Sequence, residues 1–152
     1  MMKVKPLFGA VMFLVLATVA IAQSDYVHVA KARGTFAEVK ESLVRAIEDR
    51  GLVVNNTAHV GLMLDRTGRD LGSNGQIYRE AEVIEFCSAK ISRAMMEQDP
   101  QSIVLCPYGI SVYTLRSQTD AVYLAYRRFP AVPGVKAAAD LVEAIVNDAL
   151  GQ

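Results

Sequence analysis

The residues of this chain that offer the most definite chemistry are its two cysteines, Cys87 and Cys106. Cys87 follows the strand-like segment 81–86, and Cys106 follows the strand-like segment 102–105. A segment long enough for a helix separates the two. If the two segments were neighbouring parallel strands, both sulfurs would lie at one level of the sheet, within disulfide range. An even number of cysteines favours a disulfide in an oxidising compartment. Three alternatives stay open: a disulfide, two inert buried thiols, or a functional thiol or ligand pair.

One feature of the sequence favours thiol chemistry at Cys87. A helix is predicted to begin directly after it, at Ser88, and the positive end of a helix dipole stabilises a thiolate. The run Cys106-Pro107-Tyr108 resembles the start of a glutaredoxin active site, but Gly109 stands where that site has its second cysteine. The residues that follow are strand-like, whereas the redox motif opens a helix. A thioredoxin-like redox site is therefore not expected.

Histidines and methionines add few candidates for a metal site. His28 lies in the first predicted strand and His59 at the start of the second predicted helix, and neither has a partner at zinc-ligand spacing. His59 is the better candidate for lining a ligand site, because it lies beside a glycine-rich loop. Met63, Met95 and Met96 are possible soft ligands by chemistry, but their helical spacing is typical of core residues.

The first 22 residues have the three parts of a cleavable secretory signal peptide. A basic head with Lys3 and Lys5 precedes an uncharged apolar run over 7–22, which ends in the small-residue pattern Ala20-Ile21-Ala22. The apolar run is shorter than the roughly 20 residues that a membrane-spanning helix needs. We therefore predict cleavage after Ala22 and no membrane attachment of the mature chain.

Size and charge bound what the mature chain can be. Removing 22 of 152 residues leaves 130, the size of one domain, so we expect a single α+β domain over 23–152. The full chain has 16 basic and 16 acidic side chains, and loss of Lys3 and Lys5 leaves 14 basic against 16 acidic. This balance argues against a nucleic-acid partner, which would need a basic surface.

Hydrophobic periodicity predicts the element order βαβαβαββα. The firmest element is a helix that starts with the capping box Thr35-x-x-Glu38 and ends before Gly51. We expect a two-layer α+β sandwich, with a mixed sheet of about five strands covered by helices. The predicted strands are 26–30, 52–54, 81–86, 102–105 continuing as 110–115, and 121–129, and the predicted helices are 35–50, 58–65, 88–98 and a C-terminal helix that includes 138–149.

Four segments together resemble a known bacterial family. They are 59–72 (HVGLMLDRTGRDLG), 85–90 (EFCSAK), 99–100 (DP) and 106–113 (CPYGISVY). The chain is similar over about 26–130 to the domain-of-unknown-function family numbered three hundred and two, in its exported branch. The resemblance implies a compact α/β sandwich that often self-associates, a bacterial origin and, with export, a periplasmic location.

The resemblance marks certain positions but implies no agreed activity. The recurring family positions are His59, Cys87, Pro107 and Tyr108, and the exported branch adds Cys106. Many cytoplasmic relatives have a cysteine after the proline, where this chain has Tyr108. This difference speaks against one thiol mechanism shared by the whole family.

The main functional hypothesis is a non-enzymatic periplasmic binding or accessory domain. Cys87, Cys106, His59 and Tyr108 would line its ligand site, and the sequence identifies neither a small-molecule ligand nor a cofactor. The first alternative is a redox protein or a carrier of sulfur species or a soft metal on the cysteine pair. The second is a structural domain stapled by a Cys87–Cys106 disulfide. A homo-oligomer is the one protein partner that the resemblance implies.

Overall fold

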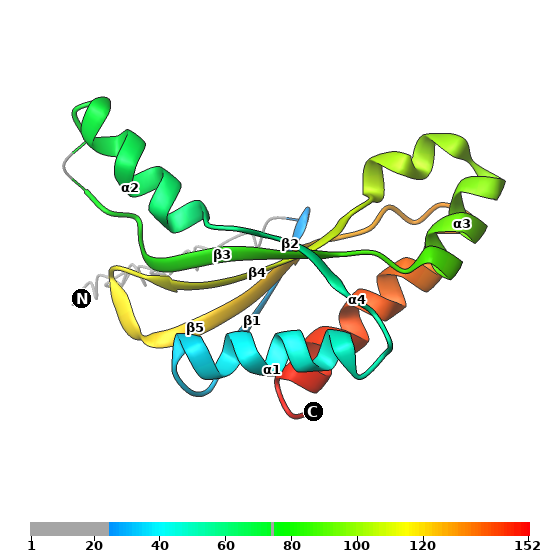
Figure 1. The fold of residues 1–152 in the computed structure, drawn as a ribbon, viewed down its shortest axis with the longest axis horizontal. Coiled ribbons are helices and arrows are strands. Elements are labelled where there is room, and N and C mark those ends of the chain that lie inside the picture. The colour runs from blue at the N-terminus through cyan, green and yellow to red at the C-terminus, as the bar shows by residue number, and fades with distance from the viewer. Residues whose placement is uncertain (1–24, 74) are drawn as a thin grey trace, which may run out of the picture.

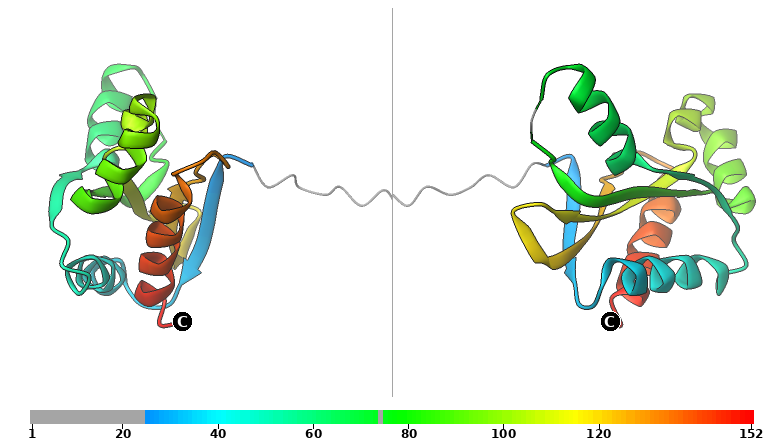
Figure 2. Two further views of the ribbon diagram at one scale, coloured as in Figure 1. Left: turned by 90° about the vertical axis from the view of Figure 1, so that its right-hand side faces the viewer. Right: turned by 60° about the vertical axis from the view of Figure 1, so that its left-hand side comes forward.

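The computed structural model describes residues 25–73 and 75–152, so the predicted signal peptide lies outside the described residues. Within these residues the strands form a five-stranded sheet in the spatial order β1-β5-β4-β3-β2, and every neighbouring pair is antiparallel. Figure 1 shows the sheet with its helices, and Figure 2 shows the same chain from two further directions. The strands are β1 (Val27–Ala32), β2 (Val54–Ala58), β3 (Tyr78–Phe86), β4 (Tyr108–Leu115) and β5 (Gln118–Arg127).

Two helices, α1 (Phe36–Glu48) and α4 (Lys136–Ala149), lie against each other and cover one face of the sheet (Figure 1). The predicted capping box at the start of α1 is confirmed. The Glu38 amide donates to the Thr35 hydroxyl at 3.3 Å, and the Thr35 amide donates to the Glu38 carboxylate at 2.8 Å. This pairing satisfies amides that the first helical turn leaves without partners.

Alternation along the strands creates the core between sheet and helices. On β4, Tyr108, Ile110 and Val112 are buried while the residues between them are half-buried, which is the period of two expected of a strand with one covered face. Leu43 and Ile47 of α1 meet this face and are 0% exposed. The apolar stripe of α1 therefore faces inward, as its helical spacing predicts.

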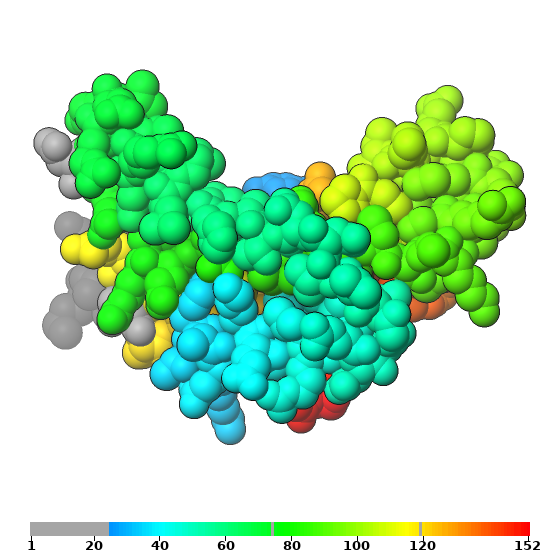
Figure 3. Space-filling view, in the orientation of Figure 1, coloured from blue at the N-terminus to red at the C-terminus, as the bar shows by residue number. Residues whose placement is uncertain are grey.

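The opposite face of the sheet is open between two projecting elements. Helix α2 (Val60–Asp70) lies at one end, and α3 (Ala89–Gln98) with the 3-10 helix η1 (Pro100–Leu105) lies at the other (Figure 1). Figure 3 shows the hollow between these two elements. A cavity of about 280 Å³ lies over this face, lined by residues that include Val29, Val83 and Tyr113.

The predicted fold class and element order are confirmed: the chain is a two-layer α+β sandwich with five strands and the order βαβαβαββα. The prediction of a mixed sheet is wrong in that detail, since all strand pairs are antiparallel. The predicted strand over 102–105 is also wrong, because these residues belong to η1. The Asp99 side chain caps this turn by accepting from the Gln101 amide at 3.0 Å, and Pro100 is its first residue.

The two errors have one physical cause. Because α3 and η1 lie at the end of the sheet and not across its face, the chain re-enters at the end it left. β4 must then run antiparallel to β3, and Phe86 lies opposite Tyr108. The parallel crossover assumed from the sequence would have needed α3 to pack on the sheet face.

The second strand and helix are shifted from their predicted bounds. The polar residues 55–57 predict an N-cap for the following helix, but they lie in β2, where the Asn56 side-chain amide donates to the Glu85 carboxylate of β3 at 2.8 Å. Helix α2 continues to Asp70, beyond the predicted end at residue 65. Its first turn lies close to β3, since a Cβ on Gly61 would be 3.0 Å from the Ala81 nitrogen.

Leu43→Ala tests whether the α1 face carries the core. The side chain is 0% exposed, so its truncation removes buried apolar area and leaves a cavity. We expect the free energy of unfolding, measured with urea, to fall by about 2–5 kcal/mol. The matched control is Leu71→Ala, because Leu71 is 84% exposed and its loss should cost no more than about 0.5 kcal/mol. Equal effects of the two substitutions would contradict the packing described.

Candidate functional site

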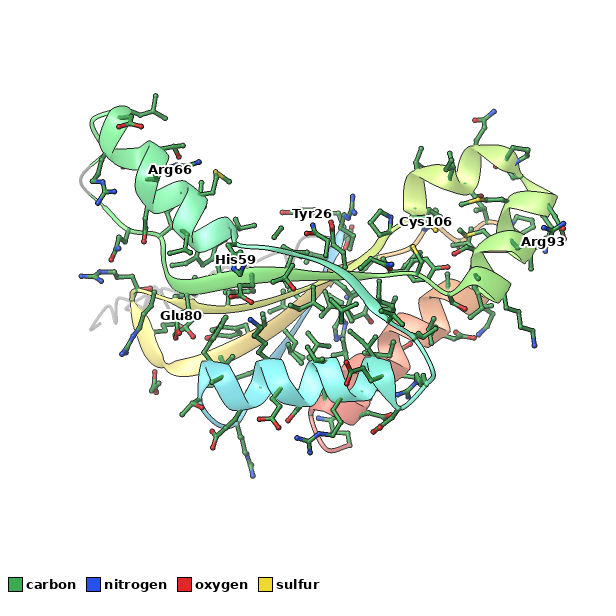
Figure 4. All side chains as sticks on the ribbon, in the orientation of Figure 1. Tyr26, His59, Arg66, Glu80, Arg93 and Cys106 are labelled. Carbon is green, nitrogen blue, oxygen red and sulfur yellow. The ribbon has the colours of Figure 1, made fainter. Side chains whose placement is uncertain are left out.

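Four side chains that carry sulfur or hydroxyl groups converge where β3 ends and β4 begins, and we call them the thiol cluster: Cys87, Ser92, Cys106 and Tyr108. Cys87 follows β3, and Ser92 lies in the second turn of α3. Cys106 ends η1, and Tyr108 opens β4. The antiparallel β3–β4 pairing therefore brings the two cysteines together, although they are distant in sequence. Cys106 is labelled at this end of the sheet in Figure 4.

The Ser92 hydroxyl connects the cluster. Its Oγ lies 3.1 Å from the Cys106 sulfur and 3.0 Å from the Tyr108 phenol oxygen. Tyr108 is 1% exposed, and its ring packs edge-on against Phe86 and Phe129 at centroid distances of 5.7 and 5.9 Å. The phenol is thus held by the core, and through Ser92 it fixes the position of the Cys106 sulfur.

The environment of the cluster keeps Cys87 in the thiol form. Burial raises the pKa of the Cys87 thiol, and the charge and hydrogen bond of the neighbouring Cys106 raise it further. The Tyr108 amide, which donates to the Cys87 sulfur, acts in the opposite direction on this pKa but does not prevail. Burial likewise raises the pKa of the Tyr108 phenol, against the lowering effect of its hydrogen bond with Ser92. Near neutral pH both groups are protonated.

The raised pKa of Cys87 is opposite to the lowered pKa that the helix dipole predicts. The sequence suggested that Cys87 would be stabilised as a thiolate at the start of a helix. The structure makes Ser88 the N-cap of α3, where its hydroxyl accepts from the Ile91 amide at 3.4 Å. Cys87 precedes that N-cap and lies outside the helix, and burial is the largest cause of its raised pKa.

Both cysteines are free in the structure. The parallel-strand geometry that suggested a disulfide is wrong, because the strands are antiparallel and 102–105 is helical. The two cysteines still lie near each other, because both flank the Phe86–Tyr108 pair of the antiparallel strands on the same side. The structure thus shows two neighbouring thiols and not a covalent bridge.

A small cavity lies beside the cluster, on the side of η1 and the end of β5. Its volume is about 100 Å³, and Pro107, Tyr108, Phe129, Arg127 and Arg128 are among its lining residues. Neither cysteine lines it. The guanidinium groups give its surroundings positive charge, which suits a small anionic group more than a cation.

The structure separates His59 from the thiol cluster. His59 precedes α2, and its Nδ1 lies 3.1 Å from the Glu82 carboxylate in the middle of β3. Because a strand rises about 3.3 Å per residue, Glu82 and Cys87 are roughly 15 Å apart along the chain. Figure 4 shows His59 and Cys106 well apart along the sheet. Of the predicted site residues, Cys87, Cys106 and Tyr108 are therefore brought together, and His59 is not.

His59 instead belongs to a small polar cluster with Glu82 and Lys40. The Lys40 Nζ lies 2.5 Å from Glu82 Oε2 and forms an ion pair with it. The geometry of this pair is not that of a hydrogen bond. A cavity of about 180 Å³ adjoins it, lined in part by His59, Asp65 and Arg79. The sequence contained a sign of this cluster, since Glu82 occupies an inward position of β3 together with Ile84 and needs a partner there.

No pattern in the sequence predicts that Ser92 belongs to the thiol cluster. Its partners come from η1 and β4, so no local spacing along α3 marks it. Across residues 25–73 and 75–152, no three or more His, Cys, Asp or Glu side chains are grouped so as to hold a metal ion. In the same part of the chain, every helix is too short or too polar to cross a membrane.

Comparisons with known proteins agree on the family. The family model described as "Domain of unknown function DUF302" matches residues 27–152. The crystal structure of an uncharacterized conserved DUF302 protein from Bacillus stearothermophilus has a similar fold, with a TM-score of 0.64 and 14% sequence identity. The match covers 83% of this chain and 96% of that one. None of the curated proteins matches this chain.

The pH dependence of alkylation tests the coupling of the two cysteines. The rate at Cys87 follows its thiolate fraction, so its half-maximal pH should exceed that of an unperturbed cysteine. Cys106→Ser removes one cause of the raised pKa, and we expect the half-maximal pH of Cys87 to fall. Iodoacetamide labelling with peptide mass spectrometry measures both, with Ser111→Ala on the open sheet face as control. An unchanged or higher value in Cys106→Ser would contradict the coupling.

Proposed function

The chain belongs to the family DUF302, and from that premise we propose that it is an exported, non-enzymatic binding or accessory domain whose ligand is held at the thiol cluster. The observation that carries the proposal is the convergence of two free thiols with the hydroxyl groups of Ser92 and Tyr108. These groups come from four separate elements, β3, α3, η1 and β4, and the packed Tyr108 ring fixes their arrangement. Such a prearranged set of donors loses little conformational entropy when it binds a ligand.

The protonation of the cluster supports binding over catalysis. A nucleophilic cysteine is activated by a lowered pKa or by an adjacent base. The pKa of Cys87 is raised, and the negative charge of the Glu85 carboxylate acts in the same direction on it. The Cys106 sulfur contacts the hydroxyl of Ser92. The ring of His59 is engaged with Glu82 and does not serve as a base for either cysteine.

Export sets the chemical environment in this proposal. Residues 1–22 have the pattern of a cleavable signal, and removal of that segment in a bacterium would place the mature domain in the periplasm. Free thiols persist there only if they are occupied, shielded or kept reduced. A ligand bound at the cluster would provide that protection.

A second function is favoured by the proximity of the two thiols. As a redox pair, Cys87 and Cys106 would each lose one proton and one electron and form a disulfide, with an exported thiol oxidoreductase in its disulfide form accepting the electrons. If the same bond were permanent, the cysteines would serve only as a staple, which typically stabilises a domain by about 2–4 kcal/mol. Both versions require the sulfurs to be covalently joined in the cell.

The expected partners complete the proposal. Self-association, implied by the family resemblance, stays a prediction that sedimentation velocity of the mature domain would measure. No nucleic-acid partner is proposed, because the mature chain has 14 basic against 16 acidic side chains after loss of Lys3 and Lys5. No attachment of the mature chain to the membrane is proposed, because the predicted cleavage removes the apolar segment.

Export is tested by the N-terminus of the protein made in a bacterial host. We expect the periplasmic fraction to contain a chain that begins at Gln23, measured by intact-mass spectrometry. Ala22→Arg replaces the small residue next to the cleavage site and should leave the precursor uncut. Recovery of the intact chain from Met1 in the cytosol would overturn the periplasmic assignment.

The redox state of the cysteines separates the candidate functions. Cells are quenched in acid, and free thiols are alkylated in denaturant before and after reduction. The binding proposal expects the two thiols of the exported protein to be alkylated without reduction. A disulfide in the extracted protein would contradict it. The urea stability of that disulfide form before and after mild reduction then distinguishes a labile redox pair from a staple.

A further inference from the structure

We propose that the thiol cluster binds a thiophilic monovalent cation of the Cu(I) type, held between the sulfurs of Cys87 and Cys106. The inference rests on the proposed function and identifies the class of ligand that the same site takes. It starts from the donor set, which consists of two free thiols that the antiparallel Phe86–Tyr108 pairing brings to the same end of the sheet.

The number and softness of the donors select the ion. Thiolate ligands prefer soft metals, and Cu(I) is satisfied by two thiolates in a near-linear arrangement, whereas structural zinc takes four ligands. The cluster offers two sulfurs, with the hydroxyls of Ser92 and Tyr108 and the Glu85 carboxylate in their surroundings. Hydroxyl and carboxylate groups are weak ligands for a soft ion, so the two sulfurs define the coordination.

Binding by this pair is an exchange of protons for a cation and involves no electron transfer. Two thiols and one Cu(I) give a bis-thiolate complex with one negative charge and two released protons. Because a thiol must lose its proton to bind a metal, binding of the cation displaces both thiol protons into solvent.

Ser92 and Tyr108 are suited to stabilise that negative charge. With the Tyr108 phenol donating to Ser92 Oγ over 3.0 Å, the Ser92 hydroxyl is free to donate to the Cys106 sulfur over 3.1 Å. A hydrogen bond of this kind becomes stronger when the sulfur that accepts it carries charge. Ser92 is in this view a positioning residue, which acts on the metal through Cys106.

The test uses the reduced mature protein, residues 23–152, and Cu(I) under anaerobic conditions, with a coloured Cu(I) chelator as competitor. We expect one Cu(I) per chain, a sulfur-to-copper charge-transfer absorption in the ultraviolet, and two sulfur neighbours by X-ray absorption. Cys87→Ser and Cys106→Ser should each abolish competition with the chelator. Ag(I), which is resistant to redox change, should occupy the same site.

The variant Ser92→Ala tests the hydroxyl network and should weaken Cu(I) binding on the order of 10–100-fold, as for other partners of metal ligands. Ser111→Ala is the matched control, because Ser111 lies on the open sheet face away from the sulfurs, and its affinity should be unchanged. Circular dichroism of each variant shows whether it is folded. A folded Ser92→Ala with unaltered affinity would overturn the role given to Ser92.

The outcomes also separate this inference from the function on which it rests. Free thiols in the exported protein, combined with Cu(I) binding that is absent or equal in Cys87→Ser and Cys106→Ser, would overturn the metal site alone. A native disulfide that excludes Cu(I) until it is reduced would overturn both the metal site and the binding function. Stoichiometric Cu(I) binding that requires both cysteines supports both.

Discussion

The antiparallel pairing of β3 with β4 is the constraint on which the candidate site depends. It places Phe86 opposite Tyr108, and the chain on either side of that pair carries Cys87 and Cys106. Helix α3 and η1 connect β3 to β4 at this end of the sheet, so Ser92 of α3 lies beside Cys106. The core that stabilises the sheet and the cluster that gives it chemistry share one residue, Tyr108, whose ring is buried and whose hydroxyl reaches Ser92.

Sharing a residue between core and site has a consequence for the chemistry. Burial holds the Tyr108 phenol in place, and the same burial raises the pKa of Cys87 and of Tyr108. The cluster therefore combines fixed geometry with a protonated Cys87 thiol and a protonated Tyr108 phenol. That combination is suited to holding a ligand that displaces protons, and poorly suited to an attacking thiolate.

Patterns along the chain predicted the elements better than their arrangement. The capping box and apolar spacing located α1, and the element order followed from periodicity, because these signals act over a few residues. The direction of β4 was missed because it depends on where α3 packs, which no local spacing encodes. For the same reason Cys87 and Cys106 were identified by residue type, while Ser92 and the Glu82–Lys40 pair needed the tertiary structure.

The adjacency of the two free thiols is the central claim, and a reagent that bridges neighbouring thiols measures it most directly. Phenylarsine oxide condenses with two nearby thiols to give one dithioarsenite and one water. The account predicts a single adduct on the reduced mature domain that blocks alkylation of both Cys87 and Cys106, and no stable adduct on Cys87→Ser or Cys106→Ser. Two cysteines that remain separately alkylated in the presence of the arsenical would contradict it.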